Sequence, residues 1–123
     1  MVDVRIILSA LWVAVEFLYQ QGDTQRLYSG DYKPGQLELG GVMSPQTLWM
    51  VSAITMTIPV AMIILSLILP HNANRWANIV VAILFFLYTL IGVARYPSAY
   101  DRFLLIVSLV ANALTVWFAW KWV

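Results

Sequence analysis

The 123-residue chain has very little charge. Asp, Glu, Lys and Arg make up 11% of it, whereas hydrophobic residues make up 62%. A soluble domain carries about 25% charged residues. A chain of this length cannot hide such a deficit in its interior, because a small domain has much surface for its volume. We therefore expect one domain, residues 1–123, that is solvated by lipid.

The chain also lacks cysteine and has one histidine, His71. The absence of cysteine excludes thiol–disulfide chemistry, thiolate metal sites and cysteine-ligated iron–sulfur clusters. One histidine cannot supply the ligands of a metal centre, and a haem held by His71 would have only Met62 as a candidate second ligand. No pattern places a serine beside His71. The sequence therefore predicts no metal or cofactor and favours a non-enzymatic protein.

The balance of charges bears on the partners. Seven Lys and Arg stand against six Asp and Glu, which gives a formal net charge of +1. Such a chain has no basic patch that could neutralise phosphates, so nucleic acid is not an expected partner. The expected partners are the lipid bilayer and either further copies of the chain, as a homo-oligomer, or a larger membrane protein.

Four stretches approach the length of about 20 apolar residues that a membrane span needs. They cover about residues 4–20, 45–69, 74–95 and 98–122, and residues 22–43 form a long first loop. Ser44-Pro45 is typical of a helix start, and Pro70 ends the second stretch. The first apolar run leads into Glu16 without a cleavage pattern, so we expect a retained helix. The prediction is an all-α, up-down-up-down bundle of four transmembrane helices.

Aromatic and basic residues indicate how the bundle lies in the membrane. Tryptophan and tyrosine collect at membrane interfaces. One expected interface holds Trp76, Trp117, Trp120 and Trp122, and the other holds Tyr19, Trp49, Tyr96 and Tyr100. The basic residues are nearly equal on the two sides, so they do not set an orientation. We expect the inner membrane, with both termini in the cytoplasm because the long loop also carries Asp23, Asp31 and Glu38.

Small and polar residues recur at helical spacing in every expected span. The four stripes are Ser9, Trp12, Glu16 and Tyr19; Ser52, Thr55, Pro59, Met62 and Ser66; Asn78, Phe85, Thr89 and Gly92; and Asp101, Leu105, Ser108, Asn112, Thr115, Ala119 and Trp122. Membrane helices associate through such residues, so packing is the plain interpretation. The alternative is a polar pathway through the bundle, in which Asn112 would be a candidate ligand.

Pro59 predicts a kink near the middle of the second span, and it is a candidate hinge. A proline inside a helix removes one backbone donor and displaces the carbonyl of the residue four positions earlier, here Thr55. The hydroxyls of Thr55 and Thr57 are expected to satisfy part of what the proline frees.

Glu16 is a charge that lies about one helical turn inside the end of the first expected span. A charge there costs at least about 2.5 kcal/mol unless it has a partner, a raised pKa or water. Arg95, Arg102 and Arg26 are the candidate partners in a structural ion pair. The alternative is a proton or cation site at Glu16, with Arg95 beside it. A lone carboxylate in the first of four short helices is similar to the small multidrug-resistance transporters, although the rest of their pattern is absent.

Arg75 begins the third span at the opposite surface. We expect it to anchor the helix among headgroups, and Asp3 lies at the same level and could pair with it. Asn78 lies one helical turn further on, near Asn74, Ser66 and Ser9. The functional alternative for Arg75 and Asn78 is the binding of a lipid headgroup.

The segment Asn74-Arg75-Trp76-Ala77-Asn78-Ile79 resembles part of a family of small four-helix prokaryotic membrane proteins, known as domain of unknown function six-three-two-six. Further similar stretches are Leu8–Trp12, Ile58–Met62 with Leu65-Ser66, Pro34-Gly35 with Gly40-Gly41, and Trp117–Trp122. The resemblance covers nearly the whole chain and implies a fold but no activity. The family's asparagine–tyrosine pair near the end of the first helix is replaced here by Glu16-Phe17 with Tyr19.

Three functions follow as hypotheses. The first is a membrane protein that acts through helix packing, as an oligomer or as an accessory subunit of a larger partner. The second is a small oligomeric transporter, or a proton or cation pathway, that uses Glu16 with Pro59 as its hinge. The third is a lipid-binding protein that uses Arg75 and the polar side chains near it.

Overall fold

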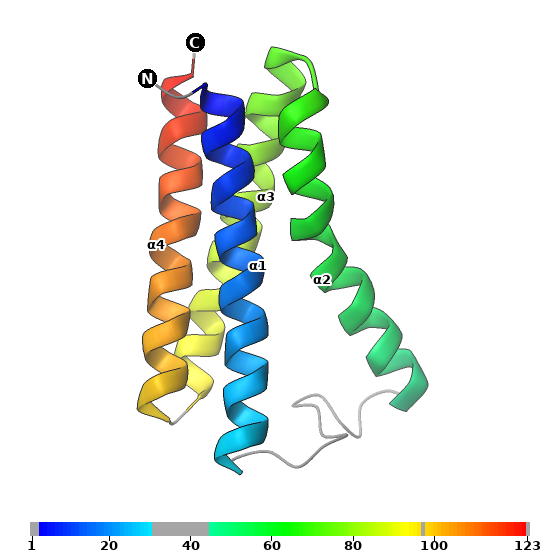
Figure 1. Cartoon of the computed structure of the whole chain (residues 1–123), viewed down its shortest axis with the longest axis vertical. Coiled ribbons are helices and arrows are strands. Elements are labelled where there is room, and N and C mark those ends of the chain that lie inside the picture. Colours follow the sequence, from blue (N-terminus) through cyan, green and yellow to red (C-terminus); the bar gives the residue numbers. More distant parts are fainter. Residues whose placement is uncertain (1–2, 31–44, 97, 123) are drawn as a thin grey trace.

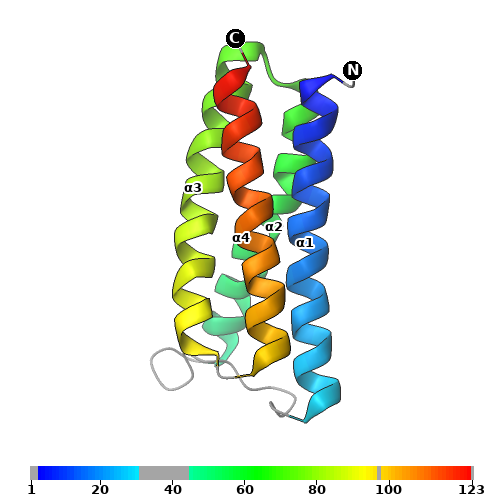
Figure 2. The ribbon, with the colours of Figure 1, turned by 90° about the vertical axis from the view of Figure 1, so that its left-hand side faces the viewer.

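A computed structural model describes residues 3–30, 45–96 and 98–122 of the chain. These residues form four helices, α1 (Val4–Ser29), α2 (Pro45–Ile68), α3 (His71–Arg95) and α4 (Ala99–Lys121). The helices run up-down-up-down, and both termini lie at one end of the bundle (Figure 1). We call this the termini end and the opposite one the loop end. The turned view shows α4 between α1 and α3 in front, with α2 behind (Figure 2).

The structure confirms the predicted all-α four-helix bundle. Among the described residues, α2 from Trp49, α3 and α4 are long and apolar enough to cross a membrane. Helix α1 is as long as the others but carries more polar residues, and it is not among those three. It packs closely against both α2 and α4 along the bundle. By length and hydropathy, the candidate membrane spans among the described helices are therefore α2, α3 and α4.

Helix α1 is longer than the sequence predicted. It ends at Ser29 and not near Gln20, so the expected loop over 22–43 was wrong in its first part. Gly30 ends the helix in the left-handed conformation (φ 80°), which glycine adopts without steric cost. At the other end, the Asp3 carboxylate accepts a hydrogen bond from the Arg5 backbone N–H and so caps the helix. The rest of the expected loop, residues 31–44, lies outside the described residues.

The predicted stripes lie largely in the interior. The side chains of α4 at Asp101, Ser108, Asn112, Thr115 and Ala119 are buried. So are Asn78, Phe85 and Thr89 of α3, and Pro59, Met62 and Ser66 of α2. On α1 the buried line runs through Ser9, Trp12, Val15 and Tyr19, and it leaves Glu16 to one side. The Trp12 and Phe85 rings meet edge to face, 6.0 Å apart, at the centre of the core.

A closed hydrogen-bond network holds the termini end together. Asn78 Oδ1 accepts bonds from Trp12 Nε1 (2.7 Å) and from the Ser66 hydroxyl (3.2 Å). Asn78 Nδ2 donates to Asn74 Oδ1 (2.7 Å), and Asn74 Nδ2 donates to the Ser66 carbonyl (2.7 Å). All four side chains are fully buried. Their mutual hydrogen bonds offset the cost of burying these side chains, so helix packing is sufficient to account for this cluster.

Helix α2 leans away from α1 in its first half (Figure 1). Pro59, for which the sequence predicts a kink, is buried near the middle of this helix. The Thr55 and Thr57 hydroxyls donate to the carbonyls of Val51 and Ala53. They do not bond to the Thr55 carbonyl that the proline displaces, so that part of the expectation was wrong. Bonds of this kind to the preceding turn themselves bend a helix.

Candidate functional site

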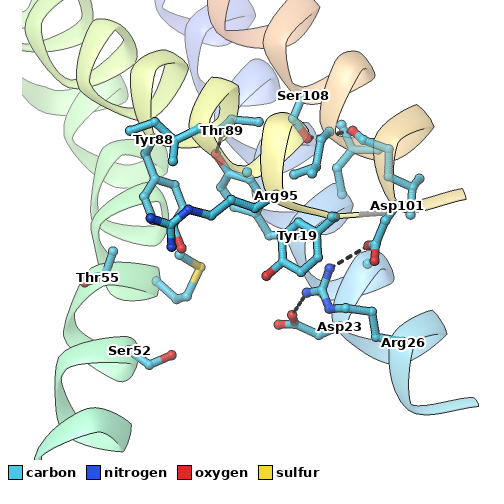
Figure 3. A pocket seen from close by; sticks show the side chains of 18 of the residues that line it. Tyr19, Asp23, Arg26, Ser52, Thr55, Tyr88, Thr89, Arg95, Asp101 and Ser108 are labelled. Carbon is cyan, nitrogen blue, oxygen red and sulfur yellow. Dashed lines mark hydrogen bonds and ion pairs between the residues drawn. The ribbon is translucent and has the colours of Figure 1, made fainter. Parts of the chain in front are cut away.

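A cavity of about 320 Å³ lies at the loop end, where the first half of α2 stands off from the bundle. All four helices line it. Its polar lining consists of Tyr19, Asp23 and Arg26 of α1, Ser52 and Thr55 of α2, Tyr88, Thr89, Arg95 and Tyr96 of α3, and Asp101 and Ser108 of α4 (Figure 3). Its apolar lining includes Leu18, Val51, Met56, Ile91, Leu104 and Leu105. We call this space the loop-end cavity.

An ion-pair cluster forms the outer wall of the loop-end cavity. Arg26 Nη1 lies 2.6 Å from Asp101 Oδ1, and Arg26 Nη2 pairs with Asp23 (Figure 3). The Arg26 guanidinium also lies over the Tyr96 ring, 4.9 Å from its centroid. Asp101 is in the first turn of α4 and Arg26 is in the last turn of α1. Each charge therefore also interacts favourably with the dipole of its own helix.

Hydroxyl groups line the inner part of the cavity. The Tyr19 and Thr89 hydroxyls share one hydrogen bond of 2.6 Å that joins α1 to α3. The Ser108 hydroxyl donates to the Leu104 carbonyl (3.0 Å), so its oxygen can still accept. The inner wall therefore offers neutral hydrogen-bonding groups, and the charged lining side chains are two guanidiniums and two carboxylates.

The polar side chains of the lining are hydroxyls, carboxylates and guanidiniums, which can hold a ligand by hydrogen bonds and ion pairs. The cavity lining contains no histidine and no nucleophile with a base beside it. Within residues 3–30, 45–96 and 98–122, no three His, Asp or Glu side chains come together as a metal site would require. His71 lies at the termini end, with its ring edge to face against Trp122 at 4.4 Å. The arrangement can enclose a small molecule that is partly apolar and partly polar.

The structure separates the three residues predicted for a substrate or an ion. Arg95 lines the loop-end cavity. Asn112 is buried beside the Tyr19 hydroxyl, behind the inner wall. Glu16 does not line the cavity. It lies in a shallow groove with Gln20 of α1 and Ile63 of α2, and its Oε2 has no hydrogen-bond partner among the described residues. The ion pairs expected for Glu16 do not form, because Arg26 pairs with Asp23 and Asp101.

The residues predicted for lipid binding lie at the termini end. Arg75 donates from Nε to the Ala119 carbonyl (3.0 Å) and from Nη2 to the Trp120 carbonyl (2.9 Å), so it caps the last turn of α4. The expected pairing of Arg75 with Asp3 is replaced by this cap. Asn78 belongs to the closed network described above. Neither residue lies near the loop-end cavity.

The ion pair between Arg26 and Asp101 is the site feature that sequence reasoning missed. It was missed because the first helix was ended at Gln20, which placed Arg26 in a loop. Two signals mark the true end: Ser29 followed by Gly30, and a basic residue in the turn before them. Reading these signals would have placed Arg26 on the helix, at the level where α4 begins.

A comparison with known protein families decides the relationship that the Asn74–Ile79 segment indicated. The profile of a family of unknown function, DUF6326, matches residues 2–123. The chain belongs to DUF6326. No curated protein and no solved structure matches the chain. The function of this DUF6326 protein therefore has to be argued from its own side chains.

Proposed function

We propose that this DUF6326 protein binds one amphipathic molecule without net charge in the loop-end cavity. The observation that carries the proposal is the cavity itself, which opens beside α2 and combines an apolar lining with a balanced set of charges. A cavity with a mostly apolar wall and a few converging polar groups is the usual form of a small-molecule site. The third hypothesis, lipid binding, thus moves from Arg75 to the opposite end of the bundle.

The charges of the lining favour a neutral ligand. Two guanidiniums, Arg26 and Arg95, stand against two carboxylates, Asp23 and Asp101. Arg26 is already engaged by both carboxylates. A ligand with a net charge would therefore leave a surplus of one sign in a space of low dielectric, where an uncompensated charge is costly.

The depth of the lining favours an amphiphile. Along α4, the lining runs from Asp101 to Ser108, which at the helical rise is about 10 Å. Polar groups lie at both levels, and the apolar side chains of Leu104 and Leu105 lie between them. A molecule that combines polar groups with an apolar body suits this lining, and the bilayer is the phase that supplies such molecules.

A test compares three probes that share one acyl chain: 1-monooleoylglycerol, oleate and oleylamine, which have neutral, anionic and cationic heads. The probes are added to the purified protein in mild detergent, and the bound fraction is read by native mass spectrometry. We expect 1-monooleoylglycerol to be retained at least about tenfold more than either charged probe, a factor equal to about 1.4 kcal/mol.

Two variants on α2 locate the binding. Ser52→Phe fills the cavity from its lining and should abolish retention of 1-monooleoylglycerol. Ile54→Phe adds a comparable side chain at a position of α2 that is 59% exposed and outside the lining, and it should bind as wild type does. Equal retention by both variants, or stronger retention of a charged probe, would contradict the proposal.

A second candidate function rests on the outer face of α1. Glu16, Gln20 and Thr24 follow one helix face beside α2, within a surface that is otherwise largely apolar. The stripes of small and polar residues lie largely in the interior of one chain. The outer face of α1 is therefore the surface that we consider for association with a second copy. The Gln20 carboxamide both donates and accepts, so it can pair with its own copy on a second chain. If Glu16→Leu with Gln20→Leu leaves the oligomeric state in native mass spectrometry unchanged, this face forms no such contact.

A further inference from the structure

Asn112 of α4 is buried with the Tyr19 hydroxyl beside it, but its amide makes no hydrogen bond of normal geometry within the part of the chain that the structure describes. Its side chain is 0% exposed, and neither Nδ2 nor Oδ1 has a partner among the described residues. Buried polar groups in native structures are almost always bonded, and an unbonded one costs stability. The amide therefore points to a partner other than the residues packed around it.

The surroundings of Asn112 place it directly behind the deep end of the loop-end cavity, one layer beyond the residues that line it. It lies beside the Tyr19 hydroxyl and one helical turn from Ser108. Tyr19, Thr89 and Ser108 all line the cavity. Because the Tyr19 and Thr89 hydroxyls share a single bond, one of their two protons is still available to donate. The deep end thus combines free donors with free acceptors.

Asn78 shows that a fully buried asparagine in this bundle can form hydrogen bonds with the side chains packed around it. It is equally buried, at 0% exposure. Its amide is bonded to Trp12, Ser66 and Asn74. The two asparagines have the same side chain and the same burial, yet only Asn78 has its partners within the described fold. They also differ in their neighbours, because Asn112 lies next to Tyr19 and Ser108, which line the loop-end cavity.

We infer that Asn112 is the deep recognition residue of the loop-end cavity and binds a neutral ligand group that both donates and accepts hydrogen bonds, such as a hydroxyl or a carboxamide. This inference rests on the proposed function and deepens it. The group is neutral because the groups next to Asn112 are the uncharged hydroxyls of Tyr19 and Ser108, whereas Asp101 and Arg26 lie at the loop end. The ligand enters from the loop end with this group innermost.

The experiment uses 1-monooleoylglycerol and methyl oleate, which share an acyl chain. The glycerol head donates and accepts, whereas the methyl ester only accepts. We expect wild-type protein to retain 1-monooleoylglycerol about tenfold more than methyl oleate in native mass spectrometry. Asn112→Leu, a change of similar volume, should remove this preference and leave the weak retention of methyl oleate unchanged.

Thermal unfolding without probe separates recognition from packing. Asn112→Leu should melt at the wild-type temperature or above it, because it removes unbonded polar atoms. Asn78→Leu should melt lower, because it breaks a closed network. If Asn112→Leu does not fold, Asn112→Ala takes its place in the same comparison.

Three outcomes would overturn the inference. If Asn112→Leu loses stability as Asn78→Leu does while its probe preference is retained, Asn112 binds a structural water or serves packing. If Ser52→Phe abolishes retention and Asn112→Leu does not change it, the cavity binds the probe without Asn112, and only the proposed function stands. If wild-type protein retains neither probe, the proposed function and the inference fall together.

Discussion

The pair formed by Arg26 and Asp101 is asymmetric at the level of single residues. The Asp101 side chain is 2% exposed, whereas Arg26 is 16% exposed and also pairs with Asp23. Removing Arg26 therefore leaves a buried carboxylate without its partner. Removing the Asp101 charge leaves a guanidinium that keeps Asp23 and the Tyr96 ring. The two substitutions should not cost the same.

We expect Arg26→Met to lower the free energy of unfolding by about 3–5 kcal/mol, because it strands a buried charge. Asp101→Asn should cost clearly less, about 1.5–3 kcal/mol for one charged hydrogen bond. Unfolding in detergent can be followed by the fluorescence of the six tryptophans. Gln25→Met, on an exposed side chain next to Arg26, is the matched control. Equal losses for the two charge variants would show that the pair is not effectively buried.

Sequence patterns predicted which polar residues turn inward but not which of them meet. Helical spacing was sufficient to place Ser108, Asn112 and Thr115 in the interior. Spacing within one helix cannot show the rotation of a neighbouring helix, and this rotation decides that Tyr19 reaches Thr89 while Glu16 faces a groove. The partners of Glu16 were mispredicted for this reason.

At the scale of helices, Arg75 of α3 supports the end of α4. Its fork of N–H groups reaches two carbonyls in the last turn of α4, and its charge lies where the helix dipole favours a cation. Lysine carries the same charge but cannot offer two donors in this planar geometry.

We therefore expect Arg75→Ala to lower the free energy of unfolding by about 1.5–3 kcal/mol, and Arg75→Lys to recover less than half of this. Hydrogen exchange of the amides in residues 115–122 should become faster in both variants, which reports fraying of this end. Lys121→Ala changes an exposed cation of the same helix end and serves as the control. Unchanged exchange in Arg75→Ala would mean that the cap does not hold the helix end.

The bend of α2 can be tested with spin labels. The chain lacks cysteine, so labels attach only at the cysteines that are introduced. Spin labels at Gln21→Cys of α1 and Ile54→Cys of α2, both exposed, report the separation of these helices at the loop end. Pro59→Ala restores a backbone donor and should bring α2 closer to α1, which shortens the mean distance and lowers probe retention. A pair at Ala10→Cys and Leu67→Cys, nearer the termini end, should be unchanged. An unaltered loop-end distance would assign the bend to packing and not to Pro59.

Helix ends were less predictable than helix cores. Hydropathy located the apolar cores of α2 and α3. Pro45 marks the start of α2, and Pro70 separates α2 from α3. Hydropathy failed for α1, because a helix can continue through Gln, Asp and Thr after the apolar stretch ends, while packing against its neighbours stabilises it. The loop-end cavity was not predictable, since it depends on the bend of α2 and on the far end of α1 together.

For the whole molecule, the two ends of the bundle differ in character. The termini end is closed by the Trp12, Asn78, Asn74 and Ser66 network and surrounded by exposed tryptophans. Cations lie over several of these rings: Arg75 over Trp76 and Trp120, and Lys121 over Trp117. Such rings favour the membrane interface. The loop end is open beside α2, and the proposed binding site lies there.

The remaining question at this scale is whether α1 crosses the membrane with the other three helices. It has 26 residues, about 39 Å at the helical rise, against a hydrocarbon core of about 30 Å. Its Ser9 hydroxyl bonds to the Ile63 carbonyl of α2, its Tyr19 bonds to Thr89 of α3, and its Arg26 pairs with Asp101 at the start of α4. These contacts align α1 with three helices that are apolar enough to span. We therefore predict that α1 crosses as well.

This prediction fixes the relative sides of the two termini. If α1 crosses, cysteines introduced at Asp3 and Lys121 react with a membrane-impermeant maleimide from the same side of sealed vesicles, and a cysteine at Gln25 reacts from the other side. If only α2, α3 and α4 cross, Asp3 and Lys121 react from opposite sides, because three crossings separate the ends. Insertion in both orientations would label all three sites from both sides in either case, so the comparison uses vesicles in which the Lys121 site reacts from one side only. Unequal labelling of these sites, after correction by vesicles opened with detergent, would therefore place α1 outside the membrane.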